Sequence, residues 1–268
     1  MSTEYFDIHS HLNDSRFLVD TDEVLARMRD SGTKSIVVGT DLEMSKHAIR
    51  LAEANTDLWA TIGLHPTDND KEEFDSILYA KMAAHPRVVA IGECGLDYYW
   101  PQHDSWIKGE AEEKRRQREL FKKHIAVAEN SGKPLMIHGR PTKGSMDAYE
   151  DVLTILHEHP KVLGNIHFFV GNIDIARRFL DRGFTMSYTG VLTFSGDYDE
   201  VVRFLPLEKI MSETDAPYVA PKAYRGKRNE PEFVSETVAR IAAIKGEDVA
   251  KVKEALVENA FREFKLAR

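Results

Sequence analysis

The sequence has a single cysteine, Cys94, among its 268 residues. One thiol cannot form an internal disulfide, which excludes the small secreted scaffolds that disulfides hold together. Nor does any apolar run approach the ~20 residues that a membrane-spanning helix requires. The opening residues, MSTEYFDIHS, show no basic segment followed by an apolar one. We therefore expect no secretory signal, no membrane contact and a cytoplasmic location.

Positive charge is also scarce, because 36 Lys and Arg stand against 44 Asp and Glu, a net charge of −8. A protein that coats the nucleic-acid backbone is usually basic. If nucleic acid is the substrate, the attraction must be local or must come from metal ions.

No low-complexity segment or obvious repeat is present, and no G-x-G-x-x-G follows the first predicted strand. That last absence weakens a doubly wound open sheet, which is the second choice of fold. What recurs is an alternation of β-rich runs and helical segments. The predicted strands are residues 5–9, 34–40, 58–63, 88–93, 134–138, 163–168, 184–188 and 209–213. The predicted helices are residues 21–31, 43–54, 71–84, 112–131, 147–158, 172–182, 232–245 and 247–259. Eight such units predict a parallel sheet closed into a (β/α)8 TIM barrel that forms a single α/β domain.

Metal-capable side chains recur at the C-terminal ends of the predicted strands, where the functional residues of such a barrel cluster. A lone histidine there is more often an ordinary polar residue than a ligand. Here, however, six residues from five segments converge on one mouth: His9, His11, Glu93, His138, His167 and Asp215. Four imidazoles and two carboxylates suit two divalent cations, such as Zn²⁺, Mn²⁺ or Mg²⁺. Glu93, across the barrel from the first strand, is the best candidate to bridge them.

Neighbouring residues receive other roles. Asp7 alternates with His9 in FDIHSHLND, so we expect it to orient the two histidines of that strand from behind. Cys94 should face away from the mouth as a buried packing residue. His65 follows the third strand and is predicted to contact substrate or to hold its loop. Surface positions are expected for the histidines of the helical segments: His47, His85, His124, His157 and His159.

The chain resembles the TatD-like metal-dependent deoxyribonucleases, which are amidohydrolase-type barrels. The matching motifs run along the whole sequence: DIHSHLN, IGLHP, AIGECGLDYY, PLMIHGR, GNIHFFVGN, SETDAPYVAP and RNEP. The resemblance implies metal ligands at the same six residues and divalent-metal-dependent cleavage of DNA, often from the 3′ end. One departure is Phe168, where the family commonly has cysteine; that position should point away from the metals.

The resemblance leaves two other functions open. Some relatives look like deacylases of aminoacylated tRNA, so an ester or amide hydrolase is the alternative. A non-catalytic binding protein is a weaker one, because the ligand set is complete. We expect a monomer in either case.

Candidate substrate contacts lie in the loops after the strands. The loop TDAPYVAPKAYRGKRNEP carries four cations without an acid between Asp215 and Glu230. Arg225 and Arg228 are predicted to bind phosphate, since guanidinium forks match phosphate oxygens, although a solvated loop is the alternative. Asn229 of the RNEP motif and Arg140 are further candidates. In DYYWPQHDSWIKGE, aromatic rings could stack on a base or form a small core under the loop: Tyr98, Tyr99, Trp100 and Trp106.

The expected reaction is hydrolysis without a covalent intermediate. Two ions and two carboxylate ligands leave a net charge of about +2, which draws in a phosphodiester and lowers the pKa of a water between the ions. The resulting hydroxide attacks phosphorus. Asp215, beside it, is the expected general base, and Glu93 holds both ions.

Overall fold

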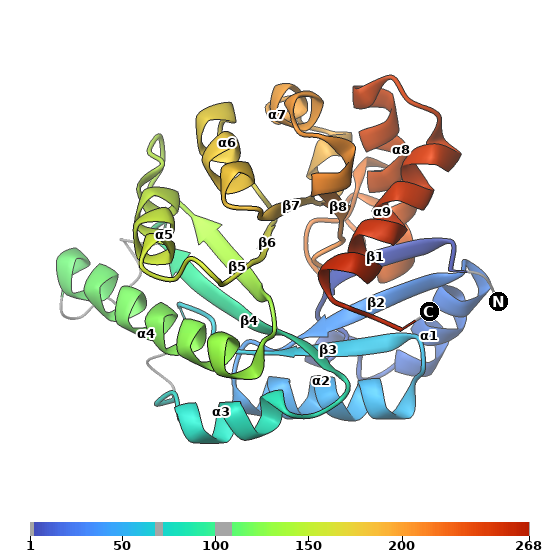
Figure 1. The fold of residues 1–268 in the computed structure, drawn as a ribbon. Helices are drawn as coiled ribbons and strands as arrows, with labels where there is room; N and C mark the ends of the chain where they lie inside the picture. Colours follow the sequence, from blue (N-terminus) through green and yellow to red (C-terminus); the bar gives the residue numbers. More distant parts are fainter. Residues whose placement is uncertain (1–2, 68–71, 100–108, 268) are drawn as a thin grey trace.

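The computed structural model describes residues 3–67, 72–99 and 109–267. Eight parallel strands form one sheet in chain order, with β1 beside β2 and so on to β8. Helices surround the sheet, as Figure 1 shows. The strands are β1 (Tyr5–Ser10), β2 (Thr33–Val38), β3 (Leu58–Ile62), β4 (Val88–Asp97), β5 (Leu135–Arg140), β6 (Gly164–His167), β7 (Thr185–Tyr188) and β8 (Ile210–Ser212). The predicted TIM barrel is confirmed.

The helices follow the strands with one addition to the expected set. They are α1 (Thr21–Asp30), α2 (Leu42–Ala54), α3 (Ser76–Ala83), α4 (Glu110–Ser131), α5 (Asp147–His157), α6 (Ile173–Asp181), α7 (Asp199–Phe204), α8 (Val234–Lys245) and α9 (Val249–Glu263). Short 3-10 turns are η1 (Ser15–Phe17), η2 (Gly190–Thr193), η3 (Leu207–Lys209), η4 (Lys222–Tyr224) and η5 (Pro231–Phe233). Helix α7 was not predicted, because six residues are too few for a clear helical periodicity. Helix α3 begins later than predicted, where the Asp75 carboxylate accepts hydrogen bonds from the amides of Ile77 and Leu78.

The barrel closes between β1 and the segment that follows β8. The His11 amide donates to the Ala216 carbonyl over 2.7 Å, and the Asp215 amide donates to the His9 carbonyl over 2.9 Å. The Ser212 hydroxyl donates a further bond to the Phe6 carbonyl at 3.1 Å. These bonds join the first strand, β1, to the last strand, β8, and to the segment that follows it at the mouth.

Apolar packing occupies the outside of the sheet and the opposite end of the barrel. Residues near the starts of the strands, including Phe6, Trp59 and Met136, form one cluster with Phe264 and Phe261 of the C-terminal segment around α9. Phe6 stacks on Trp59 with ring centroids 5.5 Å apart. Helix α9 therefore covers the N-terminal end of the barrel, which leaves the C-terminal end for a site. Within the described ranges, no helix is both long and apolar enough to cross a membrane.

His124 is buried inside this packing, so the expected surface position was wrong. Its Nε2 accepts a hydrogen bond from the Leu64 amide, and its Nδ1 donates to the Leu120 carbonyl, both at 2.9 Å. The ring lies on the buried face of α4 at helical spacing from Leu120 and Ala128. Burial lowers the pKa of His124 to about 4, so the imidazole is neutral. It fixes the loop that carries His65.

We predict that His124 makes the protein less stable as pH falls from 6.5 to 4. In that window the unfolded chain binds a proton at this imidazole, whose ordinary pKa is 6.5, whereas the folded chain does not until about 4. The resulting loss should reach about 3 kcal/mol. Between pH 6.5 and 4, the free energy of unfolding of His124→Gln should fall by about 3 kcal/mol less than that of the wild type. Urea denaturation of chelator-treated protein measures both. Above pH 7 the two curves should run parallel. Equal slopes between pH 6.5 and 4 would contradict the assignment.

Candidate metal centre

Glu93 was predicted to end its strand. It lies instead in a bulge within β4, because β4 continues to Asp97. The register of β4 against β5 shifts between Ile91 and Cys94. Gly95, just past the shift, has φ 135°, and a Cβ there would meet the His138 carbonyl oxygen at 2.1 Å. Only glycine lets the two backbones approach so closely. The bulge sends the Glu93 side chain into the mouth, while Cys94 is buried in the apolar core, as expected.

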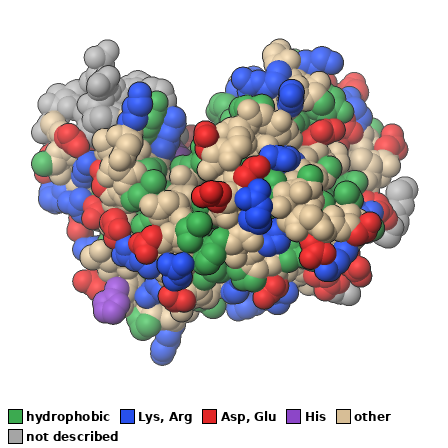
Figure 2. All heavy atoms as spheres, turned by 90° about the horizontal axis from the view of Figure 1, so that it is seen from above, with side chains coloured by type: hydrophobic (Ala, Val, Ile, Leu, Met, Phe, Trp, Pro, Cys, Tyr) green, Lys and Arg blue, Asp and Glu red, His purple; other side chains and the backbone are tan. Residues whose placement is uncertain are grey.

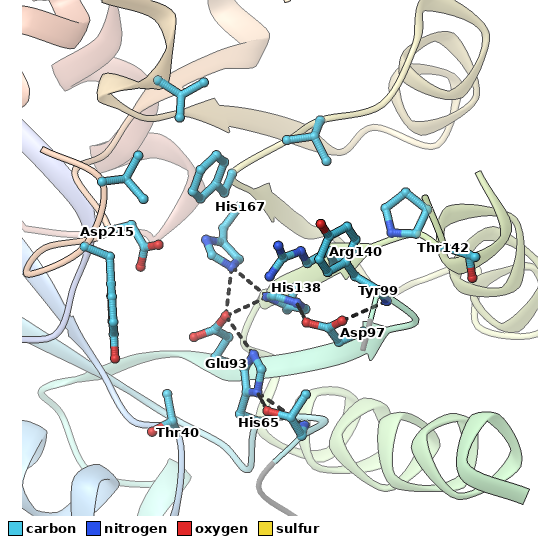
Figure 3. Close-up of a pocket in the computed structure, with 18 of the residues that line it drawn as sticks. Thr40, His65, Glu93, Asp97, Tyr99, His138, Arg140, Thr142, His167 and Asp215 are labelled. Carbon is cyan, nitrogen blue, oxygen red and sulfur yellow. Dashed lines mark hydrogen bonds and ion pairs between the residues drawn. The ribbon is translucent and has the colours of Figure 1, made fainter. Parts of the chain in front are cut away.

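The two oxygens of the Glu93 carboxylate face different histidine pairs. Oε1 lies 2.8 Å from His167 Nε2 and 2.9 Å from His138 Nδ1. Oε2 lies 3.4 Å from His9 Nε2 and 3.8 Å from His11 Nε2. Figure 3 shows the carboxylate joined to His138, His167 and His65, with Asp215 on its other side. This is the arrangement that a carboxylate needs to bridge two cations.

Asp215 completes the group on the side of β1. Its Oδ1 lies 3.3 Å from His11 Nε2 and 3.8 Å from His9 Nε2. The residue has a left-handed backbone, with φ 56°, and its amide is tied to His9 by the barrel closure. The structure thus brings together all six residues that the sequence singled out as ligands.

Charge in this group is strongly coupled. Burial raises the pKa of the Glu93 carboxyl, but the surrounding imidazoles, His167 first, outweigh burial and hold it well below its usual range. Burial lowers the pKa of His167, and the carboxylates of Glu93 and Glu213 reverse that shift and raise it well above the usual value. A carboxylate that is only 4% exposed is therefore ionised because cationic groups face it.

The donor atoms fit divalent cations. His9 Nε2 lies 3.3 Å from His11 Nε2, and His138 Nδ1 lies 3.3 Å from His167 Nε2. Two imidazole lone pairs repel at this distance unless a proton or a metal ion lies between them. Among the described residues, three sets of ligand atoms each lie within 4.8 Å of one another: His9 with Glu93 and His167, His9 with His11 and Asp215, and His65 with Asp97 and His138. Nitrogen and oxygen donors of this kind suit zinc and manganese.

A cavity of about 870 Å³ opens above these residues. Three of the predicted substrate contacts line it: His65, whose Nε2 lies 3.5 Å from Glu93 Oε1, Arg140 and Tyr99. Among the described residues that line the cavity, Tyr99 is present and Tyr98 is not. Tyr98 is fully buried, and its hydroxyl donates to the Asp151 carboxylate over 2.8 Å. Trp100 and Trp106 lie outside the described residues.

Asn229 and Arg228 have protein groups as partners. The Asn229 amide donates to the carbonyls of Thr214 and Tyr218, at 2.9 and 2.7 Å, and so holds the loop after β8. The Arg228 guanidinium forms two bonds with Asp20, of 2.7 and 2.6 Å.

Arg228 also donates to Glu230 over 2.9 Å. Arg225 lies over the Phe194 ring, 4.4 Å from its centroid. Neither arginine belongs to the described lining of the cavity. The geometry of this loop therefore gives no support to the predicted phosphate contacts. Arg228 is paired with carboxylates of the protein, and the sequence could not show this because Asp20 comes from a distant segment.

Comparison with known proteins agrees with the site. The family model for TatD related DNase matches residues 6–265. The chain belongs to the TatD family. It is 36% identical to the metal-dependent hydrolase YabD of Bacillus subtilis, over 97% of this chain and 99% of that protein. It is 31% identical to a protein of Musicola paradisiaca named 3′-5′ ssDNA/RNA exonuclease TatD, over 98% of both. The crystal structure of the TatD homolog YjjV from Escherichia coli superposes with a TM-score of 0.85 at 25% identity, covering 100% of both chains. This TatD-family protein is a metal-dependent hydrolase.

Asp97 is a site residue that the sequence reasoning missed. Its Oδ2 accepts a hydrogen bond from His138 Nε2 at 3.0 Å, which leaves the Nδ1 lone pair for the side of Glu93 and His167. Glu213 lies in a similar position behind His167, 3.4 Å from its Nδ1. The available signal was the alternation Glu93, Gly95, Asp97, which continues one strand face beyond the glutamate. Carboxylates that orient metal-binding imidazoles in this way are usual behind metal ligands.

Asp7 acts through the backbone and not through the imidazole rings, which corrects the expectation from its spacing. Its carboxylate accepts bonds from the Thr214 amide at 2.9 Å, the Thr214 hydroxyl at 2.6 Å and the His9 amide at 3.2 Å. The register of β1 shifts between Asp7 and Ser10, so strict alternation does not hold there. Asp7 therefore joins β1 to the segment that carries Asp215.

We predict that Asp97→Asn weakens one of two metal sites. The asparagine amide can donate to His138 Nε2, which moves the imidazole proton to Nδ1 and removes that lone pair from the site. The dissociation constant for one metal equivalent should rise ~10–100-fold, measured by calorimetric titration of chelator-treated protein with Zn²⁺ or Mn²⁺. The matched control is Asp14→Asn, a cavity carboxylate paired with Arg16, which should titrate as the wild type does. Unchanged titration of Asp97→Asn would contradict this role.

Arg228→Ala should lower stability and not substrate binding. It removes three charged hydrogen bonds to Asp20 and Glu230, and the expected loss in the free energy of unfolding is about 2 kcal/mol. Urea denaturation measures the loss, and Arg225→Ala is the control with little expected change. A flattened salt dependence of substrate binding, with unchanged stability, would instead restore Arg228 as a phosphate contact.

Proposed function

We propose that this protein is a two-metal deoxyribonuclease that removes nucleotides from the 3′ end of single-stranded DNA. The observation that carries the proposal is the Glu93 carboxylate, whose two oxygens face separate imidazole pairs on the floor of one cavity. Two cations that share a carboxylate can act on the two sides of one phosphodiester. The Musicola paradisiaca relative, named as an exonuclease of single-stranded DNA and RNA, supports the choice of substrate.

Divalent cations would favour substrate entry, because carboxylates outnumber Arg and Lys side chains in the cavity. Its described lining has four carboxylates, Asp14, Glu93, Asp97 and Asp215, against two cations, Arg140 and Lys143. In the metal-free site, raised pKa values let His11, His138 and His167 carry positive charge that offsets part of this excess. Two divalent cations would add the positive charge that attracts a phosphodiester. Acidic and basic side chains are interspersed over the face that Figure 2 displays, so the attraction for a polyanion is local.

The chain's own residues would orient the substrate and move the proton. Bound divalent ions would stabilise the phosphoryl oxygens and lower the pKa of a coordinated water. Asp215 is 15% exposed toward the cavity; burial raises its pKa, but His11 and His9 outweigh burial and lower it, so the carboxylate is ionised at neutral pH. It accepts the proton of the attacking water. The phosphorus–oxygen bond to the leaving nucleotide then breaks, and the leaving oxygen receives that proton.

His65 and Arg140 are the substrate contacts that we retain. His65 lies on the same side of Glu93 as His138, where its imidazole can donate to a phosphoryl oxygen. Arg140 follows His138 on β5 and belongs to the cavity lining with Lys143. Arg140 and Lys143 can both bind the phosphate group that neighbours the cleaved phosphodiester.

The experiment is hydrolysis of a 3′-labelled oligonucleotide by protein that has been stripped and reloaded with Zn²⁺, Mn²⁺ or Mg²⁺. We expect release of single nucleotides, up to two metals per chain by elemental analysis, and loss of both cleavage and binding in chelator. Asp215→Asn should lower kcat ~10²–10⁴-fold with a smaller change in KM, because an amide cannot accept the proton. The control is Glu213→Gln. The Glu213 carboxylate contacts Phe168, Ser187 and His167 behind the site, so this variant should lose less activity than Asp215→Asn.

Aminoacyl-tRNA and RNA of the same sequence are assayed beside the DNA. Hydrolysis of the aminoacyl ester without cleavage of any phosphodiester would replace the proposal with a deacylase. Asp215→Asn with both metals bound and near wild-type kcat would remove Asp215 as the base.

A further inference from the structure

We propose that Tyr99 and Tyr218 are two base-stacking platforms that hold the unpaired bases on the two sides of the scissile phosphodiester. This inference rests on the proposed nuclease function and adds how a single strand is recognised. The shared chemistry is an unpaired nucleobase in DNA or RNA, because every base has a flat face that can stack on an aromatic ring.

The two rings lie on opposite sides of the metal centre. Tyr99 follows the end of β4, and Tyr218 follows β8. Strands β4 and β8 are four places apart in an eight-stranded ring in chain order, so their ends face each other across the mouth. Both tyrosines line the cavity that has Glu93 and Asp215 on its floor. A phosphodiester bound between those carboxylates therefore has one ring on each side.

Each ring contacts a guanidinium and remains partly exposed, and Tyr218 also meets the His11 ring edge to face at 6.0 Å between centroids. The Arg140 guanidinium carbon lies 4.0 Å from the centroid of Tyr99, and that of Arg16 lies 4.3 Å from the centroid of Tyr218. Such contacts fix an aromatic ring without burying it. Tyr99 is 42% and Tyr218 46% exposed, which leaves area for a further flat group. Large aromatic side chains that remain exposed at a polar cavity are typical of ligand contacts.

The backbone of each tyrosine is anchored to the site. The Tyr99 amide donates to Asp97, the residue that orients His138, over 3.0 Å. The Tyr218 amide donates to the Asp215 carbonyl over 2.9 Å, and its own carbonyl accepts from Asn229 over 2.7 Å. Asn229 thus acts as a positioning residue for the exposed ring of Tyr218. Each platform is placed by the same segments that place the metal ligands.

The rest of the cavity suits bases better than a paired duplex. The lining also includes apolar side chains beside the charged floor: Met44, Met146, Val170, Val191 and Val219. Bases within a duplex stack on their neighbours and cannot offer a face to a tyrosine, whereas unpaired bases can. The site should therefore require an unpaired base at both positions next to the cleaved bond.

The test combines tyrosine variants with abasic oligonucleotides. The substrates are single-stranded DNA with a tetrahydrofuran residue in place of the 3′-terminal or the penultimate nucleotide, together with the intact DNA and RNA. On intact DNA, Tyr99→Ala and Tyr218→Ala should each lower kcat/KM between about 5- and 150-fold, mainly through KM. Tyr99→Phe and Tyr218→Phe should keep activity, because the ring face remains. Metal content should stay at the wild-type value in all four.

The coupling between variant and substrate identifies the contact. If Tyr99 holds one of the two bases, removing that base should not slow Tyr99→Ala further, and the other base should behave likewise with Tyr218→Ala. Phe204→Ala is the matched control, since Phe204 is 37% exposed and has the Arg177 guanidinium 5.3 Å from its ring centroid, outside the described cavity lining. It should match the wild type on every substrate. Equal effects on DNA and RNA are expected, because stacking ignores the sugar; a loss confined to one of them would contradict stacking.

Two failures remain distinguishable. A wild-type protein that cleaves no oligonucleotide with any metal contradicts the proposed nuclease function. A wild type that cleaves DNA, together with alanine variants that retain full kcat/KM or an indifference to both abasic positions, overturns the platforms and leaves the nuclease function intact.

Discussion

The buried carboxylate of Glu93 is the constraint on which the rest of the site depends. An ionised carboxylate that is 4% exposed is unfavourable unless cationic or hydrogen-bonding groups surround it. Histidines at the ends of β1, β5 and β6 supply those groups, at distances between 2.8 and 3.8 Å. The charge can be balanced in this way only if the strand ends meet. The candidate metal ligands and the closed barrel therefore impose the same geometry.

The barrel closure shows how directly the site and the fold are linked. The backbone bonds that join β1 to the segment after β8 are made by His9, His11 and Asp215 themselves, with Ala216. Asp7 reinforces the junction through Thr214. A shift of one strand against the other would separate the carboxylate of Asp215 from the imidazoles of β1. Packing at the far end, where α9 covers the starts of the strands, leaves the mouth free for substrate.

Electrostatics and recognition act at different distances in this protein. The net charge of −8 and the interspersed surface charges give little long-range attraction for a polyanion. Within the cavity, the carboxylates outnumber the Arg and Lys side chains, and divalent ions would add positive charge. In the proposed nuclease, metal loading would thus control both chemistry and substrate entry, and the exposed tyrosines would contribute a part of the affinity that does not depend on charge.

The sequence by itself determined the barrel and the six residues at its mouth. Alternating strand and helix patterns allow few parallel arrangements, and the C-terminal ends of parallel strands must lie together, so the pattern alone is enough to group His9, Glu93 and Asp215. Asp97 was missed because the predicted strand ended at Glu93, whereas β4 continues to Asp97 on the same strand face. Local periodicity misjudged Asp7, because the register of β1 shifts between Asp7 and Ser10.

Tertiary structure decided which similar side chains face the cavity and which face protein. Arg140 lines the cavity, whereas Arg228 binds Asp20, a residue more than 200 positions away. Tyr99 is exposed at the mouth, whereas its neighbour Tyr98 is buried against Asp151. His124 is neutral inside the core because α4 packs its ring against the loop after β3. In each case the residue type alone could not decide, because the partner came from a segment that only folding brings close.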